Sequence, residues 1–308
     1  MRHILEPDSR TLHGYFSPDY PPVLTVDPGD TVTLRTLDCW WSAGPYQGGR
    51  HDDRPRVTSY RPGFGHALVG PIAVRGARPG TTLSVRIDEV VPAAWGTTLA
   101  GAGLTPHDQR YGIAGAETVH RWQLNPTGST GRNQFGHTVA LQPFLGVLGL
   151  PPAQPGEHST IPPRRCGGNL DCKDLVAGST LLLPVTVDGA LFSAGDGHAA
   201  QGDGEICGTA IECPMDRVRL TFDLIEDQPL TGPVARVDGA WLTFGLGDTL
   251  DAAAADALDA MITMLTRRYD LARGDAVALA SVVVDVRVTQ IVNKVVGVHA
   301  RLADDAIR

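Results

Sequence analysis

The sequence predicts a mainly β fold of the α+β type, in which a jelly-roll-like antiparallel β-sandwich is joined to an α+β second half. Three observations lead to this prediction. Short alternating segments follow one another between turn signals. Glycine and proline are abundant, with 36 and 23 of 308 residues. One long amphipathic segment lies near the C-terminal end. We place the sandwich half in residues 1–140 and the α+β half, which carries the candidate site loops, in residues 141–308.

Alternating polar and apolar residues, bounded by Pro, Gly and Asp, predict the strands. The predicted strands are residues 23–26, 31–35, 72–74, 83–87, 181–187, 218–224 and 296–302. Between them, residues 93–165 contain long Gly-rich and Pro-rich stretches. Loops of that length are uncommon unless they are functional or cover something.

One helix is predicted over residues 250–271, with Leu258, Met261 and Leu265 on its apolar face and Asp248 as its N-cap. Residues 275–291 give conflicting signals, because Asp275 could begin a second helix while residues 284–289 alternate like a strand. We favour a helix there, since one strand of that length would be unusual.

Composition narrows the class of protein. The formal charge is −8 and only two lysines are present, so nucleic acid is not an expected partner. No apolar run approaches the roughly 20 residues of a membrane span, and the first residues do not form a signal peptide. Five cysteines, an odd number in a chain of this size, predict reduced thiols and a cytoplasmic protein.

The densest group of reactive side chains lies in residues 194–208, where Asp196, His198, Asp203 and Glu205 alternate with glycines. Apolar residues flank this loop, so we expect its charges to be buried, where they require partners or a metal ion. Carboxylate and imidazole ligands suit Zn²⁺ or a similar divalent ion. The alternative is a solvated polar turn.

A second polar segment, residues 165–175, contains Gly167-Gly168-Asn169 followed by Asp171 and Lys173. Its backbone N–H groups could bind an anion, and Asp171 and Lys173 would share one face of an extended segment. The alternative is an Asn-capped turn with a surface ion pair.

Several runs occur in a fixed order: residues 167–171, 181–184, 189–196 and 198–205, with further pieces at residues 66–80, 143–149 and 281–292. This pattern resembles the signature region of the acetamidase/formamidase family. The resemblance implies hydrolysis of short-chain amides such as formamide or acetamide to the carboxylate and ammonia. It also implies a metal-dependent, β-rich enzyme that assembles as a homo-oligomer.

These observations give a specific candidate site. The expected metal ligands are Asp196, His198, His66 and Asp38. The expected catalytic residues are Glu205, Asp171 and Lys173. The expected substrate-binding residues are Asn169, Gly202, Gly204 and Trp40. The expected ion is Zn²⁺, with Ca²⁺ and Mg²⁺ as alternatives.

In the expected mechanism, Glu205 takes a proton from the attacking water and returns it to the departing amine. The metal and N–H groups of the glycine loop stabilise the oxyanion. The chain departs from the family pattern at residues 39–41, where Trp40 and Trp41 replace small residues. We expect these two tryptophans to narrow the entrance of the pocket.

Several alternatives stay open. The same loop could hold a structural Ca²⁺ in a non-catalytic sandwich, and contact between the ion and His198 would argue against this, because Ca²⁺ prefers oxygen ligands. A hydrolase of lactams, ureas or carbamates is a further alternative. A nucleophilic triad of Glu205, Lys173 and a cysteine is chemically sound. The sequence lacks the βα alternation typical of such enzymes.

Overall fold

The computed structural model describes residues 1–101 and 103–308. Its largest sheet has nine strands, which are, in spatial order, β1 (Arg2–Leu5), β5 (Thr31–Leu34), β17 (Met215–Ile225), β7 (Thr82–Pro92), β15 (Thr180–Pro184), β18 (Val234–Val237), β19 (Ala240–Gly247), β21 (Val296–Ala303) and β20 (Val284–Gln290). The second sheet has six strands, β14 (Gly167–Asn169), β12 (Phe144–Gly149), β16 (Phe192–His198), β6 (Leu68–Val74) and β2 (Leu12–His13), with β4 (Leu24–Val26) also paired to β6.

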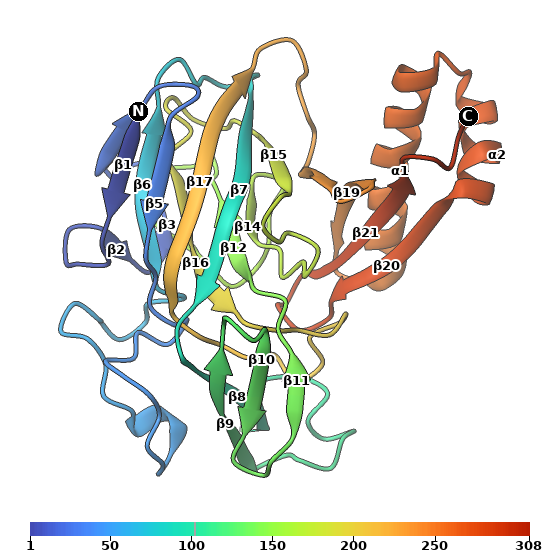
Figure 1. Cartoon of the computed structure of the whole chain (residues 1–308). Helices are drawn as coiled ribbons and strands as arrows, with labels where there is room; N and C mark the ends of the chain where they lie inside the picture. The colour runs from blue at the N-terminus through green and yellow to red at the C-terminus, as the bar shows by residue number, and fades with distance from the viewer. Residues whose placement is uncertain (102) are drawn as a thin grey trace.

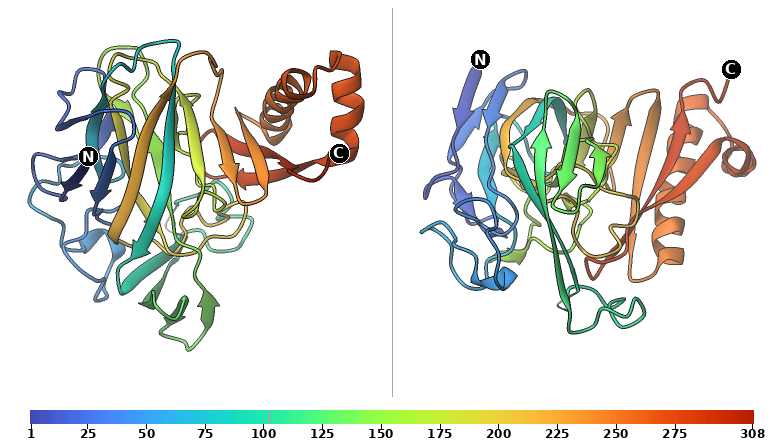
Figure 2. Two further views of the ribbon diagram at one scale, coloured as in Figure 1. Left: turned by 45° about the horizontal axis from the view of Figure 1, so that its top comes forward. Right: turned by 60° about the horizontal axis from the view of Figure 1, so that its bottom comes forward.

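Two smaller sheets complete the β structure. One pairs β11 (Thr138–Ala140), β10 (Thr130–Asn133), β9 (Glu117–Asn125) and β8 (Trp95–Gly101), and the other pairs β13 (His158–Ser159) with β3 (Tyr15–Phe16). The four-stranded sheet forms an arm that projects from one end of the sandwich (Figures 1 and 2). The arm lies in residues 93–165, where the sequence has long Gly-rich and Pro-rich stretches around a few probable strands.

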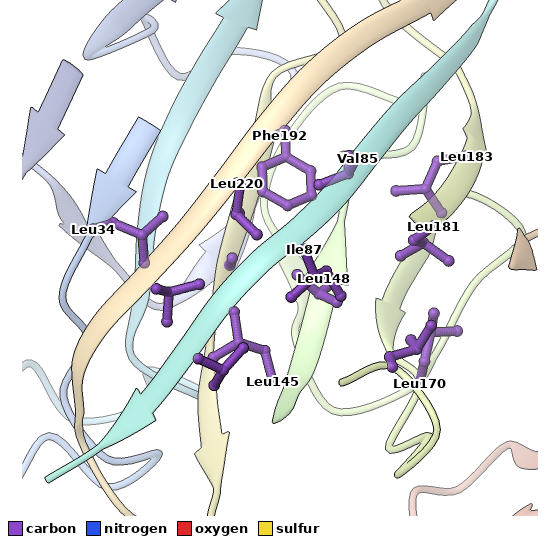
Figure 3. Packing of buried hydrophobic residues seen from close by; sticks show 14 of the residues in the cluster. Leu34, Val85, Ile87, Leu145, Leu148, Leu170, Leu181, Leu183, Phe192 and Leu220 are labelled. Carbon is purple, nitrogen blue, oxygen red and sulfur yellow. The ribbon is translucent and has the colours of Figure 1, made fainter. Parts of the chain in front are cut away.

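The core of the molecule lies between the two large sheets. Leu34, Val85 and Leu220 from the nine-stranded sheet meet Leu148 and Phe192 from the six-stranded sheet (Figure 3). All five are buried, as expected for the facing sides of two packed sheets, and every residue of β12 and β16 is buried. The predicted β-sandwich is therefore confirmed.

The boundary expected near residue 140 does not separate two bodies. Strand β7, from the first half, pairs with β15 and β17 from the second half, and β12 and β16 pair within the same sheet as β6. Strands from the two halves of the sequence are therefore hydrogen-bonded to each other within each large sheet. Local composition cannot reveal this interleaving.

The C-terminal part carries two helices, α1 (Leu250–Tyr269) and α2 (Arg273–Val283), on one side of β19 and β21 (Figure 1). Gly245 permits the close packing, because a Cβ there would lie 2.0 Å from the carbonyl oxygen of Ala253 in α1. The predicted helix is confirmed, although Thr249 and not Asp248 is its N-cap and accepts from the N–H of Ala252 at 3.2 Å.

Residues 275–291 do not form a single helix, contrary to our expectation. Helix α2 ends at Val283 and β20 begins at once, pairing antiparallel with β21 from Val284 to Gln290. The alternation over residues 284–289 thus outweighs the helical signal, because β21 supplies a partner that local sequence does not show.

All five cysteines are free, and four of them are buried in the core. Within the described part of the chain, neither helix has both the length and the apolar character needed to cross a bilayer.

Candidate active site

Five ionisable side chains lie close together at the C-terminal end of β16, beside the segment that connects β16 to β17. Asp196 and His198 lie at the end of β16, and Asp171 follows β14. Glu205 and Glu212 come from the segment between β16 and β17. Each is at most 6% exposed. The predicted burial of the charged loop therefore holds for Asp196, His198 and Glu205, whereas Asp203 is exposed.

Gly146 on β12 makes room for this cluster. A Cβ at this position would lie 2.5 Å from Oδ2 of Asp196, 2.6 Å from Oδ1 of Asp171 and 2.9 Å from Cε1 of His198. Since real side chains do not tolerate such distances, the three groups can converge only over a glycine.

The backbone of the cluster is strained. Asp171, Asp196 and Glu205 have φ angles of 47°, 59° and 48°, in the left-handed region. Such residues cost on the order of 1–3 kcal/mol each and persist where the surrounding structure holds them. They are three of the nine non-glycine residues with positive φ in the described chain. Strain is therefore concentrated at the carboxylates, as is typical of functional sites.

The imidazole of His198 has a fixed orientation. Nε2 of Gln201 donates to the carbonyl of Asp171 at 2.9 Å, so Oε1 of Gln201 must be the atom that faces Nδ1 of His198, also at 2.9 Å. Nδ1 therefore carries a proton and donates it. Nε2 faces Glu212 Oε2 at 3.1 Å and Asp196 Oδ1 at 3.4 Å. A bare Nε2 lone pair would repel both oxygens, so this position calls for a proton or a cation.

The pKa values show how much negative charge the cluster has to hold. Burial raises the pKa of Asp171 to about 8, with His198 opposing the rise and Asp196 adding to it. Burial, together with Asp171, raises the pKa of Glu205 well above its usual value, and burial raises that of Glu212. Three carboxyl groups thus tend to retain protons when no cation is present.

Asp196 and His198 shift in the opposite sense. Burial would raise the pKa of Asp196, but the nearby imidazoles of His66 and His198 outweigh it and lower that pKa. Burial would lower the pKa of His198, but Glu212 and Asp196 outweigh it and raise that pKa. These two residues therefore favour an ion pair.

A cavity of about 1020 Å³ opens onto the cluster. Asp196, Glu205 and Glu212 line it, while Asp171 and His198 lie behind them. The carboxylates that reach the cavity can meet a substrate, whereas Asp171 and His198 are not among the residues that line it.

His66 and Asn169 also line this cavity. Nδ1 of His66 lies 3.0 Å from Oγ1 of Thr160, which also accepts the backbone N–H of His66 at 2.8 Å. Nδ2 of Asn169 donates to the carbonyl of Ile161 at 3.0 Å. Its Oδ1 is buried with no hydrogen-bond partner in the described structure, and is free to accept from a ligand.

Other expected site residues have different positions. Asp38 accepts from the N–H and Oγ of Ser42 at 2.8 and 2.7 Å, and it pairs with Arg54 at 3.9 Å. Its oxygens hold a loop together and are not presented as metal ligands. Lys173 does not reach the cluster, since its ammonium pairs with Asp203 at 3.2 Å and it does not line the cavity.

The glycine loop does not supply the expected N–H donors. The N–H of Gly204 donates to the carbonyl of Thr289 at 3.0 Å, and Gly202 is exposed. Neither residue lines the cavity. The Gly204 donor is used to pair the loop with the residues at the end of β20.

Sequence reasoning missed Glu212, Gln201, Gly146 and Asn293. Nδ2 of Asn293 lies 2.5 Å from Oδ2 of Asp171 and 3.5 Å from Oε2 of Glu205. Glu212 had a usable signal, because it is a carboxylate inside the apolar run that includes Ile211 and Cys213. Asn293 had none, since it is 122 positions from Asp171.

Comparisons with known proteins show the family of this chain. The sequence model of the Acetamidase/Formamidase family matches residues 2–159 and 153–300. A formamidase of Methylophilus methylotrophus is 31% identical over 278 residues, covering 72% of this chain and 67% of that protein. An acetamidase of Mycolicibacterium smegmatis is 28% identical over 309 residues, covering 78% of this chain and 75% of that protein. The crystal structure of an acetamidase from Bacillus halodurans has a TM-score of 0.87 at 30% identity and covers 97% of both chains. This chain therefore belongs to the acetamidase/formamidase family.

Proposed function

We propose that this protein hydrolyses uncharged amides to a carboxylate and ammonia. The observation that carries the proposal is the buried cluster in which Nε2 of His198 faces two carboxylates while Glu205 reaches the adjoining cavity. The relatives named formamidase and acetamidase support the same reaction.

We also propose that the cluster holds a divalent ion, with Zn²⁺ as the first choice. Asp171 Oδ1 and Glu212 Oε2 are buried without hydrogen-bond partners in the described structure, and His198 has its second nitrogen held by Gln201, as metal-binding histidines usually do. Asp196, His198 and Glu212 would hold the ion. When bound, it would supply positive charge that polarises the substrate carbonyl.

The imidazole among the donors favours this ion over a structural Ca²⁺, which prefers oxygen ligands. If the ion is catalytic and not structural, a chelator that removes it should abolish activity and leave the protein folded.

Glu205 is the proposed proton shuttle. It is buried but lines the cavity, and its raised pKa suits a carboxylate that takes a proton and gives it back near neutral pH. It removes a proton from the water that attacks the amide carbon. It then delivers that proton to the amide nitrogen, which would otherwise leave as a strongly basic anion.

Asp171 and Asn293 position Glu205 in this mechanism. The amide of Asn293 lies between the two carboxyl groups, and one oxygen of each lies within 4.8 Å of the other and of a nitrogen of His198. Two carboxyl groups this close share a proton more readily than they ionise together. Asn169 would accept from the amide N–H₂ of the substrate and turn its carbonyl towards the cluster.

Ammonia release from formamide, acetamide and longer amides tests the proposal. The purified protein is assayed with its native metal, after chelation, and after Zn²⁺ is restored. Loss of activity on chelation and recovery with Zn²⁺ are expected. If the metal-loaded protein releases no ammonia from any amide, the proposed function is wrong.

A homo-oligomer remains a proposal. Val282 and Val286, at 81% and 48% exposure, present apolar surface on α2 and on the edge strand β20. Light scattering coupled to gel filtration would measure the mass, and a monomer at micromolar concentration would contradict the proposal.

A further inference from the structure

The cavity is much larger than formamide or acetamide requires. Its volume of about 1020 Å³ is at the upper end of the roughly 300–1,000 Å³ typical of pockets for drug-sized ligands. We expected Trp40 and Trp41 to narrow the entrance. Both line this cavity, which is wide even with them in place.

Four aromatic side chains form one side of this cavity, and we call them the aromatic wall: Trp40, Trp41, Tyr60 and Phe64. The ring centroids of Trp41 and Phe64 are 5.1 Å apart, and those of Trp41 and Tyr60 are 6.0 Å apart. Trp41, Tyr60 and Phe64 are thus neighbours, and Trp40 adds a fourth ring to the lining of the same cavity. Aromatic rings that line a cavity suit a flat apolar ligand.

The aromatic wall is held rigidly from behind. The guanidinium of Arg54 lies 4.2 Å from the centroid of Trp40, and the same group pairs with buried Asp38. His51 is buried against Trp40, with ring centroids 4.3 Å apart. Nε1 of Trp41 donates to the carbonyl of Gly65 at 2.8 Å. A wall fixed in this way loses little conformational entropy when a ligand binds.

The aromatic wall adjoins the reacting groups. Sγ of Cys39 and one oxygen each of Asp196 and Glu212 lie within 4.8 Å of one another, and Trp40 and Trp41 follow Cys39 directly in the chain. Because both tryptophans line the same cavity as Asp196 and Glu212, a substrate whose amide meets these carboxylates can place its acyl group against them.

We propose that the preferred substrates are primary amides of aromatic acids, with the aromatic ring against the wall and the amide at the carboxylate cluster. This inference rests on the proposed function for the reaction itself. It adds the chemical class of the acyl group.

The test compares kcat/KM for phenylacetamide and acetamide by ammonia release. Each buried CH₂ is worth about fourfold in binding, so the aromatic amide should be favoured at least about tenfold. Trp40→Ala should lower the ratio of the two kcat/KM values about tenfold, and Trp40→Phe should restore most of it. Trp241→Ala is the matched control, because Trp241 lies outside this cavity, and it should keep the parental ratio.

The outcomes separate this inference from the proposed function. Turnover of acetamide with a parental ratio of one or less would overturn the aromatic preference and leave the amidase proposal intact. If no amide is hydrolysed, titration calorimetry with phenylacetamide and acetamide still decides. In that case the amidase proposal fails. The aromatic wall would still be supported as a ligand site if phenylacetamide binds more tightly than acetamide and Trp40→Ala weakens its binding. If the two amides bind equally, or if neither binds, the proposed role of the aromatic wall is wrong.

Discussion

Gln201 Oε1 accepts a hydrogen bond from Nδ1 of His198 at 2.9 Å and thereby points Nε2 at two carboxylates. Removing a hydrogen-bond partner of this kind usually lowers metal affinity 10- to 100-fold. Gln201→Leu should therefore weaken Zn²⁺ binding by about that factor, measured by competition with a chelating dye. Unchanged affinity would show that Gln201 does not orient the ring for a metal.

Glu205→Gln keeps the shape of the side chain but removes the proton acceptor. It should lower kcat about 10²- to 10⁴-fold, the usual contribution of a positioned acid–base group. Metal content, measured by mass spectrometry, should stay close to that of the parent. Glu226→Gln is the control, since Glu226 is exposed and lies outside the cavity. Loss of the metal together with activity would make Glu205 a ligand.

Gly146→Ala should disrupt the cluster although it replaces none of the ionisable residues. The new methyl group would lie 2.5 and 2.6 Å from oxygens of Asp196 and Asp171, so these carboxylates must move. Metal content and kcat should both fall at least about tenfold, in line with the cost of a misplacement of about 1 Å. Gly274→Ala is the control, because its Cβ would meet nothing within 4 Å. Parental activity in Gly146→Ala would contradict the proposed arrangement.

The stability of the metal-free protein should fall as pH rises. Burial raises the pKa of Asp171 from 3.8 to about 8, so the folded state binds more protons than the unfolded state between these values. Each such proton gives a slope of about 1.4 kcal/mol per pH unit. The raised pKa values of Glu205 and His198 act in the same direction.

The measurement is urea unfolding of chelator-treated protein between pH 5 and 8. Asp171→Asn should flatten the pH dependence, and added Zn²⁺ should do the same, because a cation stabilises the ionised carboxylates. Stability that increases with pH in the metal-free protein would show that the cluster does not retain its protons.

Local patterns were sufficient where the interacting residues are close in sequence. The helix that contains Met261 and Leu265 was predicted because both residues repeat at its period. Asp196 and His198 were placed together because they lie two positions apart in the glycine-rich segment, which we expected to be a loop and which the structure forms as the end of β16.

Contacts distant in sequence could not be predicted in the same way. Asp38 looked like a ligand because its partner Arg54 is sixteen positions away, and the pairing of β20 with β21 decides the conformation of residues 284–290. Asn293 reaches Asp171 only because the C-terminal hairpin folds back against the site. Such positions are set by tertiary structure and leave no periodic trace in the chain.

The late position of Asn293 has a consequence for synthesis. Asp171 and Glu205 leave the ribosome well before Asn293, which follows them by 122 and 88 positions. Domains tend to fold from the N-terminal side as they emerge. A nascent chain can therefore begin to form the sandwich while Asp171 and Glu205 still lack the amide that lies between them, so the cluster is completed only after Asn293 has emerged.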